Sequence, residues 1–319
     1  MTAARDRLRT DCRVLEVLVE TARSLPLIFV AWIEIGKSDL INTMSDVLRE
    51  WKENAAPWRE NSATIATMFA PLTQVLIEET GITSGESVLD VAGGAGEPSL
   101  TIAEIVGPTG SVTCTDAVPE MVQSAQAGAT ERALTNVTFR QCLADELPFP
   151  DNSFDAVVSR LGVMFFPDVP RALREMLRVT KPQGRIGFAV WGRNESNPFA
   201  YVPTKVMSRY VETPPAEPDA PAAFRFAETG KLAQLLVQAG ATDVRERELR
   251  FHIEAPISPE EFWQMRSATS GTLREKLETL SDDPRKQIAS DILEAVRDYF
   301  PNGQMRFPAE MLVVSGEKP

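Results

Sequence analysis

The segment VLDVAGGAGEP, from Val88 to Pro98, is typical of a buried strand that runs into a glycine-rich turn and then into a helix. Glycine lets the backbone turn tightly and approach a ligand without a Cβ clash, and the helix that follows opens with unpaired N–H groups. Pro98 fits the first turn of this helix, where its missing N–H costs nothing. The pattern favours a site for a nucleotide-type cofactor, although glycine clusters of this kind also form plain turns.

An acidic residue follows the glycines at the spacing that such a site requires. The apolar segment SVTCT, residues 111–115, ends in Asp116, twenty residues past Gly96. At about this position a doubly wound fold places the carboxylate that accepts hydrogen bonds from the ribose hydroxyls. The sequence therefore predicts a ligand that contains adenosine.

The residues after the glycines discriminate between two cofactors. A dinucleotide site requires G-x-G-x-x-G, or alanine at the last position, with the pyrophosphate at the helix N-terminus. Here Gly94 and Gly96 are followed by Glu97, Pro98 and Ser99. The Glu97 carboxylate would place like charge beside a pyrophosphate. A cofactor without phosphates and with a cationic sulfonium suits this turn better.

Strand and helix patterns alternate along most of the chain. Strands are predicted at 87–91, 111–116, 137–141, 154–159, 184–191, 243–253 and 308–315, and helices at 97–106, 118–132, 168–179 and 228–239. Such alternation predicts an α/β fold with a doubly wound, Rossmann-like, mostly parallel seven-stranded sheet. Ligands of these sheets bind at the carboxyl ends of the strands, where Asp90, Asp116, Asp145 and Arg160 fall.

Four ordered segments carry a resemblance to a known family. They are VLDVAGGAGEPSL, TDAVPEM, ADELPFPDNSFDAVVSRLGVMFF and LREMLRVTKPQGRIGFAVWG, within about residues 55–192. They resemble the class I S-adenosylmethionine-dependent methyltransferases, in particular the ubiquinone/menaquinone C-methyltransferase-like (methyltransferase type 11) group. The resemblance implies S-adenosylmethionine as the cofactor and methyl transfer to a small-molecule acceptor, and it leaves the acceptor open.

The resemblance also implies which residues surround the methionine part of the cofactor. Asp90, Gly94 and Gly96 would border it, and Arg160 would lie near its tail. Ala92 stands where the family turn has its first glycine. We expect this alanine to bind alongside the glycines and to need no positive φ.

The adenosine part is implied to lie over the next two strands. Asp116 would hold the ribose, and Ala117 or Met121 would flank the adenine ring. Ala144 and Asp145 would meet the adenine edge.

The domain boundaries predicted from the sequence separate residues 1–43, an N-terminal extension, from a methyltransferase domain over 44–319. For the extension two alternatives stay open: translation starts at Met44 and the extension is not native, or it is an appendage that touches a membrane or a partner. Its apolar run, Leu25–Ile33, is shorter than the roughly 20 residues of a membrane span and begins too far along the chain for a signal peptide.

Helices are expected to cover the sheet at its ligand-binding edge. Residues 46–79 show helical periodicity, and Gly81 ends the helix. In the family such N-terminal helices form a lid, so Trp51 or Trp58 either walls the substrate pocket or packs against the sheet.

Two later segments are expected to select the substrate. Residues 193–225 are rich in proline and predict a mobile loop with a short helix. Residues 258–300 predict an insert of two helices, Pro259–Leu280 and Asp283–Phe300, before the last strand. This insert caps the substrate, thickens the core or forms a dimer face. Formation of a homodimer is therefore one of the alternatives.

Composition limits the partners. The net charge of −12 repels phosphate backbones, which argues against nucleic acid and favours a small neutral or cationic substrate. The three cysteines have no paired spacing and form no metal-binding pattern, which indicates a reducing, cytoplasmic location.

The expected reaction is in-line attack of an acceptor atom on the sulfonium methyl group, helped mainly by the positioning of the two ligands. The chain's single histidine, His252, lies in a strand pattern and is more simply structural, and Tyr201, Glu195 and Tyr210 stay open as bases. We therefore assign no catalytic residue. The segment Gly162–Phe166 would line an apolar pocket, which favours an aromatic, quinone-like or lipid-like acceptor.

Two other functions remain open. A non-catalytic scaffold with a methyltransferase fold fits a sequence that shows no chemical groups beyond the cofactor site. An NAD(P)-dependent oxidoreductase shares the strand–turn–helix pattern and is disfavoured by Glu97 and Ser99.

Overall fold

The computed structural model describes residues 47–212 and 219–319. The predicted extension over 1–43 lies outside these residues, as does the stretch 213–218 of the proline-rich segment. Among the described residues, no helix is long and apolar enough to cross a membrane.

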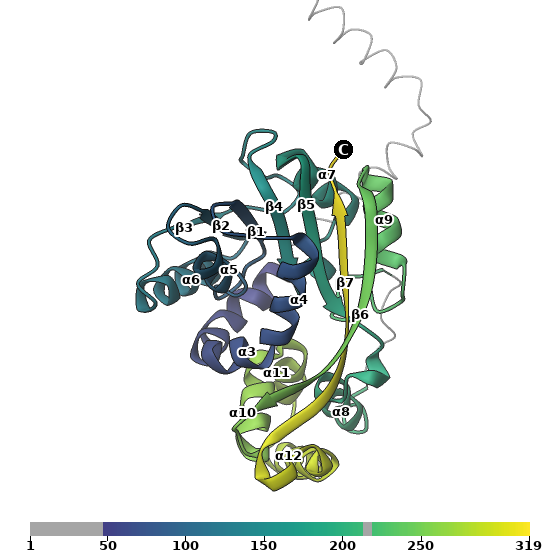
Figure 1. The fold of residues 1–319 in the computed structure, drawn as a ribbon. Helices are drawn as coiled ribbons and strands as arrows, with labels where there is room; N and C mark the ends of the chain where they lie inside the picture. Colours follow the sequence, from purple (N-terminus) through teal and green to yellow (C-terminus); the bar gives the residue numbers. More distant parts are fainter. Residues whose placement is uncertain (1–46, 213–218) are drawn as a thin grey trace, which may run out of the picture. The chain divides into compact units, whose positions relative to one another are not determined.

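A mixed sheet forms the centre of the described chain (Figure 1). Its seven strands are β1 Ser87–Val91, β2 Ser111–Asp116, β3 Val137–Gln141, β4 Phe154–Arg160, β5 Thr180–Trp191, β6 Thr242–Ala255 and β7 Met305–Glu317 within the described residues. They lie in the order β3-β2-β1-β4-β5-β7-β6. Strands β1 to β5 pair in parallel, and β7 runs antiparallel between β5 and β6. The predicted α/β, mostly parallel, doubly wound sheet is therefore confirmed.

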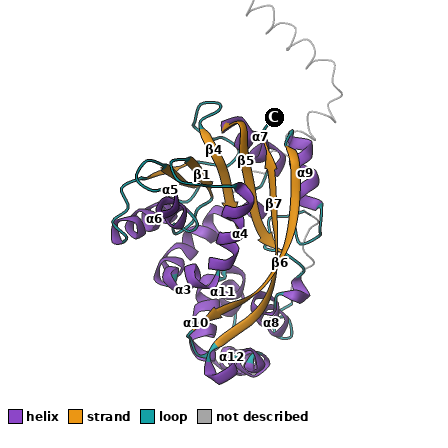
Figure 2. Cartoon of the chain, viewed as in Figure 1, coloured by secondary structure: helices purple, strands orange, loops and turns teal. Residues whose placement is uncertain are grey.

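Helices pack on both faces of this sheet (Figure 2). They are α5 Ser99–Val106, α6 Pro119–Glu131, α7 Val169–Val179 and α9 Lys231–Ala239, close to the predicted bounds. Helix α4, Ala70–Thr80, packs on β4, β5 and β7, whereas α7 and α9 pack on each other and on the same part of the sheet. Because β4 is covered in this way, nearly all of its side chains are buried.

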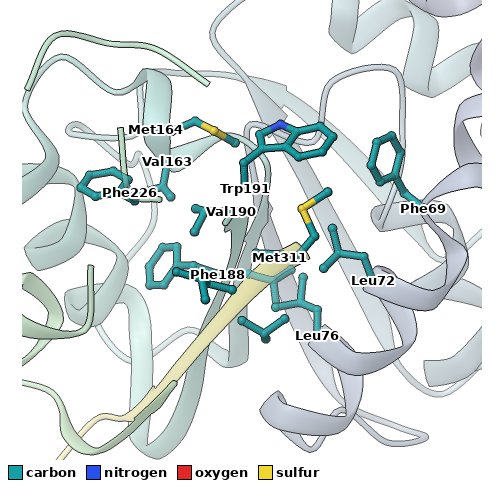
Figure 3. Close-up of a cluster of buried hydrophobic side chains, with 14 of the residues drawn as sticks. Phe69, Leu72, Leu76, Val163, Met164, Phe188, Val190, Trp191, Phe226 and Met311 are labelled. Carbon is teal, nitrogen blue, oxygen red and sulfur yellow. The ribbon is translucent and has the colours of Figure 1, made fainter. Parts of the chain in front are cut away.

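The largest hydrophobic cluster joins α4 to the centre of the sheet. Figure 3 shows Leu72 and Leu76 of α4 on the side of Met311 in β7, with Phe69 and Trp191 beyond them. Leu72, Leu76 and Met311 are fully buried. Burial of each such side chain contributes about 1.5–3 kcal/mol, so this cluster holds the carboxyl end of β5 in place.

The predicted helix over 46–79 is divided into three. Residues 47–60 are helical, and they are followed by α3 Ser62–Met68 and then α4. Pro71, in the first turn of α4, has no N–H to continue the helix from α3, which explains the interruption at Phe69. Gly81 ends α4 with a φ of 63°, as predicted.

The predicted helix Pro259–Leu280 is also divided. It forms α10 Pro259–Thr269 and α11 Gly271–Glu278, because Ser270 caps α11 by accepting a hydrogen bond from the Leu273 N–H at 3.4 Å. Helix α12, Asp282–Ala295, takes most of the second predicted helix, and α8, Pro198–Met207, is the short helix predicted in the proline-rich segment. Helices α8, α10, α11 and α12 pack together beyond the carboxyl end of β5 (Figure 1).

Candidate active site

The turn after β1 has three residues in the left-handed region. Ala92, Gly94 and Gly96 have φ values of 59°, 56° and 117°. The expectation that Ala92 needs no positive φ is therefore wrong. The turn brings Ala92 so close to the loop after β4 that a Cβ on Gly162 would lie 2.7 Å from the Ala92 Cβ. The absence of a side chain at Gly162 therefore leaves room for the Ala92 Cβ.

The two glycines predicted to border the cofactor have different roles in the fold. Space is open for 4 Å around the position of a Cβ on Gly94, so the backbone here leaves room for a ligand. A Cβ on Gly96 would lie 2.9 Å from Leu100 and 3.3 Å from Ala125. Gly96 therefore allows α5 and α6 to pack closely behind the turn.

Asp116 is held at the end of β2 by two backbone groups. Its Oδ2 accepts from the Gly94 N–H at 3.0 Å, and its Oδ1 accepts from the Val118 N–H at 2.9 Å. Each oxygen keeps a second lone pair, which is what two ribose hydroxyls need. Burial raises the pKa of this carboxyl above its usual value, and the backbone hydrogen bonds oppose that shift.

Asp90 is a fully buried carboxyl at the end of β1. Its Oδ2 accepts from the Ser99 hydroxyl at 2.6 Å, and its Oδ1 has no hydrogen-bond partner. Burial raises the pKa of Asp90 to about 7, although the Ser99 hydroxyl and Arg160 favour the charged form. A buried oxygen without a partner marks a site that a ligand could complete.

Arg160 brings a buried cation to the same place from the end of β4. It donates to Thr73 Oγ1 at 2.7 Å and to the Glu97 carbonyl at 3.2 Å, and its guanidinium lies 5.9 Å from the Phe69 ring centroid. Its Nε is buried without a partner. Burial lowers the pKa of Arg160, and the charges of Glu97 and Asp90 oppose that shift.

These groups fit the methionine part of S-adenosylmethionine. That part carries a carboxylate and an ammonium, and the site offers an incompletely bonded guanidinium on Arg160 and an incompletely bonded carboxyl on Asp90. Gly94 leaves open space beside them.

The Glu97 side chain does not act as predicted. Its carboxylate bonds to Thr101 Oγ1 at 2.8 Å and pairs with Arg132 at 2.5 Å. The ion pair with Arg132 reduces the charge that Glu97 presents to the turn, although this charge still acts on Arg160 and Asp90. Asp90, which Ser99 contacts at the start of α5, is the carboxyl that would oppose a pyrophosphate there. Pro98 precedes α5 as its N-cap, so the prediction that it lies within the first turn is also wrong.

The residues predicted for the adenine side lie beside β2 and β3. The Ala117 carbonyl accepts from Gln141 Nε2 at 3.1 Å, and Met121 is buried at the start of α6. Ala144 and Asp145 form a turn after β3, where Asp145 lies 3.7 Å from Arg171. Their contacts with adenine stay predictions.

The helix over residues 47–60 covers the edge of the sheet at the carboxyl ends of the strands through its two tryptophans. The ring of Trp51 lies 5.6 Å from that of Trp58 and 5.1 Å from that of Phe165. Trp58 Nε1 donates to the Thr269 carbonyl at 3.0 Å. The tryptophans therefore contact the loop after β4 and the helical insert, as a lid would.

Three of the four candidate bases lie elsewhere or are engaged. His252 is on the edge strand β6, with β7, β5 and β4 between it and β1. Its Nδ1 lies 3.2 Å from Arg306, and it lines a separate hollow of about 470 Å³ together with Glu195. The Tyr210 hydroxyl donates to Asp291 at 2.6 Å.

Sequence reasoning missed two residues that position Arg160. Thr73 and Phe69 contact its guanidinium, and both are buried. The available signal was Thr73, one of two polar residues, with Thr80, on the buried face of α4.

Comparison with known proteins agrees with this geometry. A family described as a methyltransferase domain matches residues 89–188. An uncharacterised protein of Mycobacterium tuberculosis is 44% identical over 124 residues, which are 39% of this chain and 44% of the relative. The ubiquinone/menaquinone biosynthesis C-methyltransferase UbiE of Pseudomonas aeruginosa is 38% identical over 122 residues, or 38% of this chain and 48% of the relative. The matches thus span less than half the length of these curated relatives.

A solved structure shares the fold. Phosphoethanolamine N-methyltransferase 2 of Haemonchus contortus, in complex with S-adenosyl-L-methionine, aligns with a TM-score of 0.50 at 16% identity. The alignment covers 82% of this chain and 57% of that one. The family match shows that residues 89–188 form a methyltransferase domain, and the sheet order and the glycine turn agree with a class I S-adenosylmethionine-dependent methyltransferase fold.

Proposed function

We propose that the chain transfers a methyl group from S-adenosylmethionine to a small, apolar or aromatic acceptor. The observation that carries the proposal is the pair of buried, incompletely bonded groups at the ends of β1 and β4, Asp90 Oδ1 and Arg160 Nε. Buried ionisable groups that stay incompletely bonded in the protein alone are costly, and a zwitterionic ligand would satisfy both.

The chain's own residues would bind, orient and shield the reactants. When bound, S-adenosylmethionine supplies a methyl carbon that an acceptor lone pair attacks while the electron pair of the C–S bond leaves on sulfur. Asp116 would hold the ribose, with Ala117 and Met121 beside the adenine ring. Arg160 and Asp90 would hold the methionine tail. Trp51 and Phe165, in contact at the edge of the lid, would exclude water.

The site favours an acceptor that ionises easily. The Tyr210 hydroxyl is engaged by Asp291, and His252 lies on the edge strand. A phenol or an activated carbon acid needs less help from a base than an alcohol does. The acceptor proton would then pass to solvent.

The domain organisation, the cysteines and the net charge are in keeping with an enzyme that acts on a small molecule. We infer one methyltransferase domain over residues 44–319, with cap segments at 193–225 and 258–300. Cys114 and Cys142 are free thiols, in keeping with a cytoplasmic location. The net charge argues against nucleic acid as a partner, and a homodimer remains a proposal.

A transfer assay tests the proposal. The full chain is incubated with S-adenosylmethionine and a panel of quinols and phenols, and S-adenosylhomocysteine and methylated product are measured by mass spectrometry. Both are expected in equal amounts, and at a limiting concentration of S-adenosylmethionine Asp116→Ala should reduce both by about 10-fold or more. Cofactor binding without transfer to any acceptor would favour the scaffold, and binding of NADH instead would favour the oxidoreductase.

A further inference from the structure

Arg266, on α10 of the helical insert, is an unpaired cation. Among the described residues its guanidinium makes no hydrogen bond or ion pair, and its Nε is buried without a partner. It stacks on the Phe199 ring, 4.7 Å from the centroid. The residue as a whole is only half-buried, so part of the side chain remains accessible.

Other arginines of the insert are bonded. Arg274 pairs with a carboxylate of the helix over residues 47–60 at 3.1 Å. Arg285 donates to two carbonyls at the end of α11, and Arg297 pairs with a neighbouring glutamate. Arg266 is therefore distinctive in its lack of a partner, and a cation in such a place is costly unless something pairs with it.

Arg266 remains charged despite its surroundings. Burial lowers its pKa to about 10, so the guanidinium is still protonated at neutral pH. The group can therefore pair with an anion.

A row of aromatic rings connects Arg266 with the cofactor site. Arg160 lies 5.9 Å from the Phe69 centroid, and Phe69 lies 5.9 Å from Trp191 in an edge-to-face contact. Trp191, at the carboxyl end of β5, stacks on Phe199 at 6.4 Å, and Phe199 lies under Arg266. The row thus runs from the predicted methionine end of the cofactor site to the insert.

We propose that the methyl acceptor is an aromatic acid whose carboxylate pairs with Arg266. This inference rests on the proposed function and narrows its acceptor. The ring of such an acid would lie along the aromatic row, between the cofactor and the insert. The net charge of −12 opposes an anion only at long range, because salt screens charges beyond about 8 Å, whereas Arg266 acts at contact.

The test compares acids with their neutral amides. Benzoate, 4-hydroxybenzoate and 2-naphthoate, each beside its amide, are titrated by calorimetry into the full chain saturated with S-adenosylhomocysteine. The wild type should bind at least one acid about 10-fold or more tightly than its amide. Arg266→Gln should remove this preference, Arg266→Lys should keep part of it, and Arg297→Gln, at an exposed site of the insert, should keep all of it.

The outcomes separate this inference from the proposed function. Failure of the wild type to bind S-adenosylhomocysteine would overturn the proposed function. Normal cofactor binding with no preference for any acid, or with no binding of the acids, would overturn the inference alone. A preference for an acid that survives in Arg266→Gln would also overturn the inference alone. If this variant fails to fold, Arg266→Met, which can still pack on Phe199, replaces it.

Discussion

The backbone N–H of Gly94 donates a 3.0 Å hydrogen bond to Oδ2 of Asp116, 22 residues later in the chain. This bond ties the turn after β1 to the end of β2, so the two parts of the cofactor site that the sequence predicts separately are joined in the fold. Asp116 is thereby oriented before any ligand binds. Preorganised polar groups of this kind lose little entropy when they bind.

Replacement of Ala92 should reveal the conformation of the turn. Ala92→Gly should change the free energy of unfolding by less than about 1 kcal/mol, because relief of the positive φ offsets the greater freedom of glycine in the unfolded chain. Ala92→Val should destabilise by about 2 kcal/mol or more, since a β-branched residue is disfavoured at positive φ. Urea unfolding measures both. Equal stability of the valine and glycine variants would contradict the assigned φ of 59°.

Ionisation of Asp90 should make stability depend on pH. Because burial raises its pKa to about 7, the folded chain keeps a proton at pH 5 to 7 that the unfolded chain releases. This group's contribution to stability is therefore greatest below about pH 4, the usual pKa of an unfolded aspartate, and it falls as pH rises from there to about 7, where it is lost. Relative to Asp90→Asn, the wild type should lose up to about 1.4 kcal/mol per pH unit over this window.

Urea unfolding without cofactor at several values between pH 5.5 and 8.5 measures this difference. Asp155→Asn is the control, because the Asp155 pKa is lowered and this group stays ionised throughout the range. Parallel stability curves for the wild type and Asp90→Asn would show that the carboxyl does not titrate there.

Loss of the Trp58 hydrogen bond should loosen the helix over residues 47–60. Trp58→Phe removes the Nε1 donor to the Thr269 carbonyl, which should cost about 1 kcal/mol. Amide hydrogen exchange in residues 47–60 should then become about 5-fold faster if these residues open locally. Trp51→Phe, which keeps a ring against Phe165, is the control. Unchanged exchange in Trp58→Phe would mean that the insert does not hold the helix over residues 47–60 in place.

The two phenylalanines after β4 should separate substrate contact from core packing. Phe165 is half-buried against Trp51, so Phe165→Ala should reduce methyl transfer and leave S-adenosylhomocysteine affinity nearly unchanged. Phe166 is only 8% exposed, so Phe166→Ala should also cost about 3 kcal/mol of stability. Transfer assays and thermal unfolding measure the two effects. Full transfer activity in both variants would argue against an apolar acceptor pocket here.

The sheet could be predicted because its signals are local. Strands such as β1 and β4 are buried on both faces, and each is an apolar run bounded by turn residues. The parallel order then brings the ends of β1, β2 and β4 to one edge, which places Asp90, Asp116 and Arg160 there. The break at Ser270 was missed, although a serine followed by a glycine stands there in the sequence.

Other features depend on residues that are distant in the sequence. Gly162 approaches Ala92 from the loop after β4, and the Glu97 carboxylate pairs with Arg132, 35 residues away. Arg266 looks like an ordinary polar residue of α10 until Phe199 is placed beneath it. No pattern within one element reports such contacts.

Binding of S-adenosylhomocysteine measured by calorimetry tests the central claim most directly. The wild type and Asp151→Ala, an exposed acid outside the site, should bind one molecule per chain with similar affinity. Asp116→Ala should weaken binding by about 10- to 100-fold, because the ribose loses hydrogen bonds to a charged group, and Asp116→Asn, which retains one oxygen, should fall between. Absence of binding by the wild type, or equal affinity in Asp116→Ala while that variant remains folded, would contradict the assigned cofactor site.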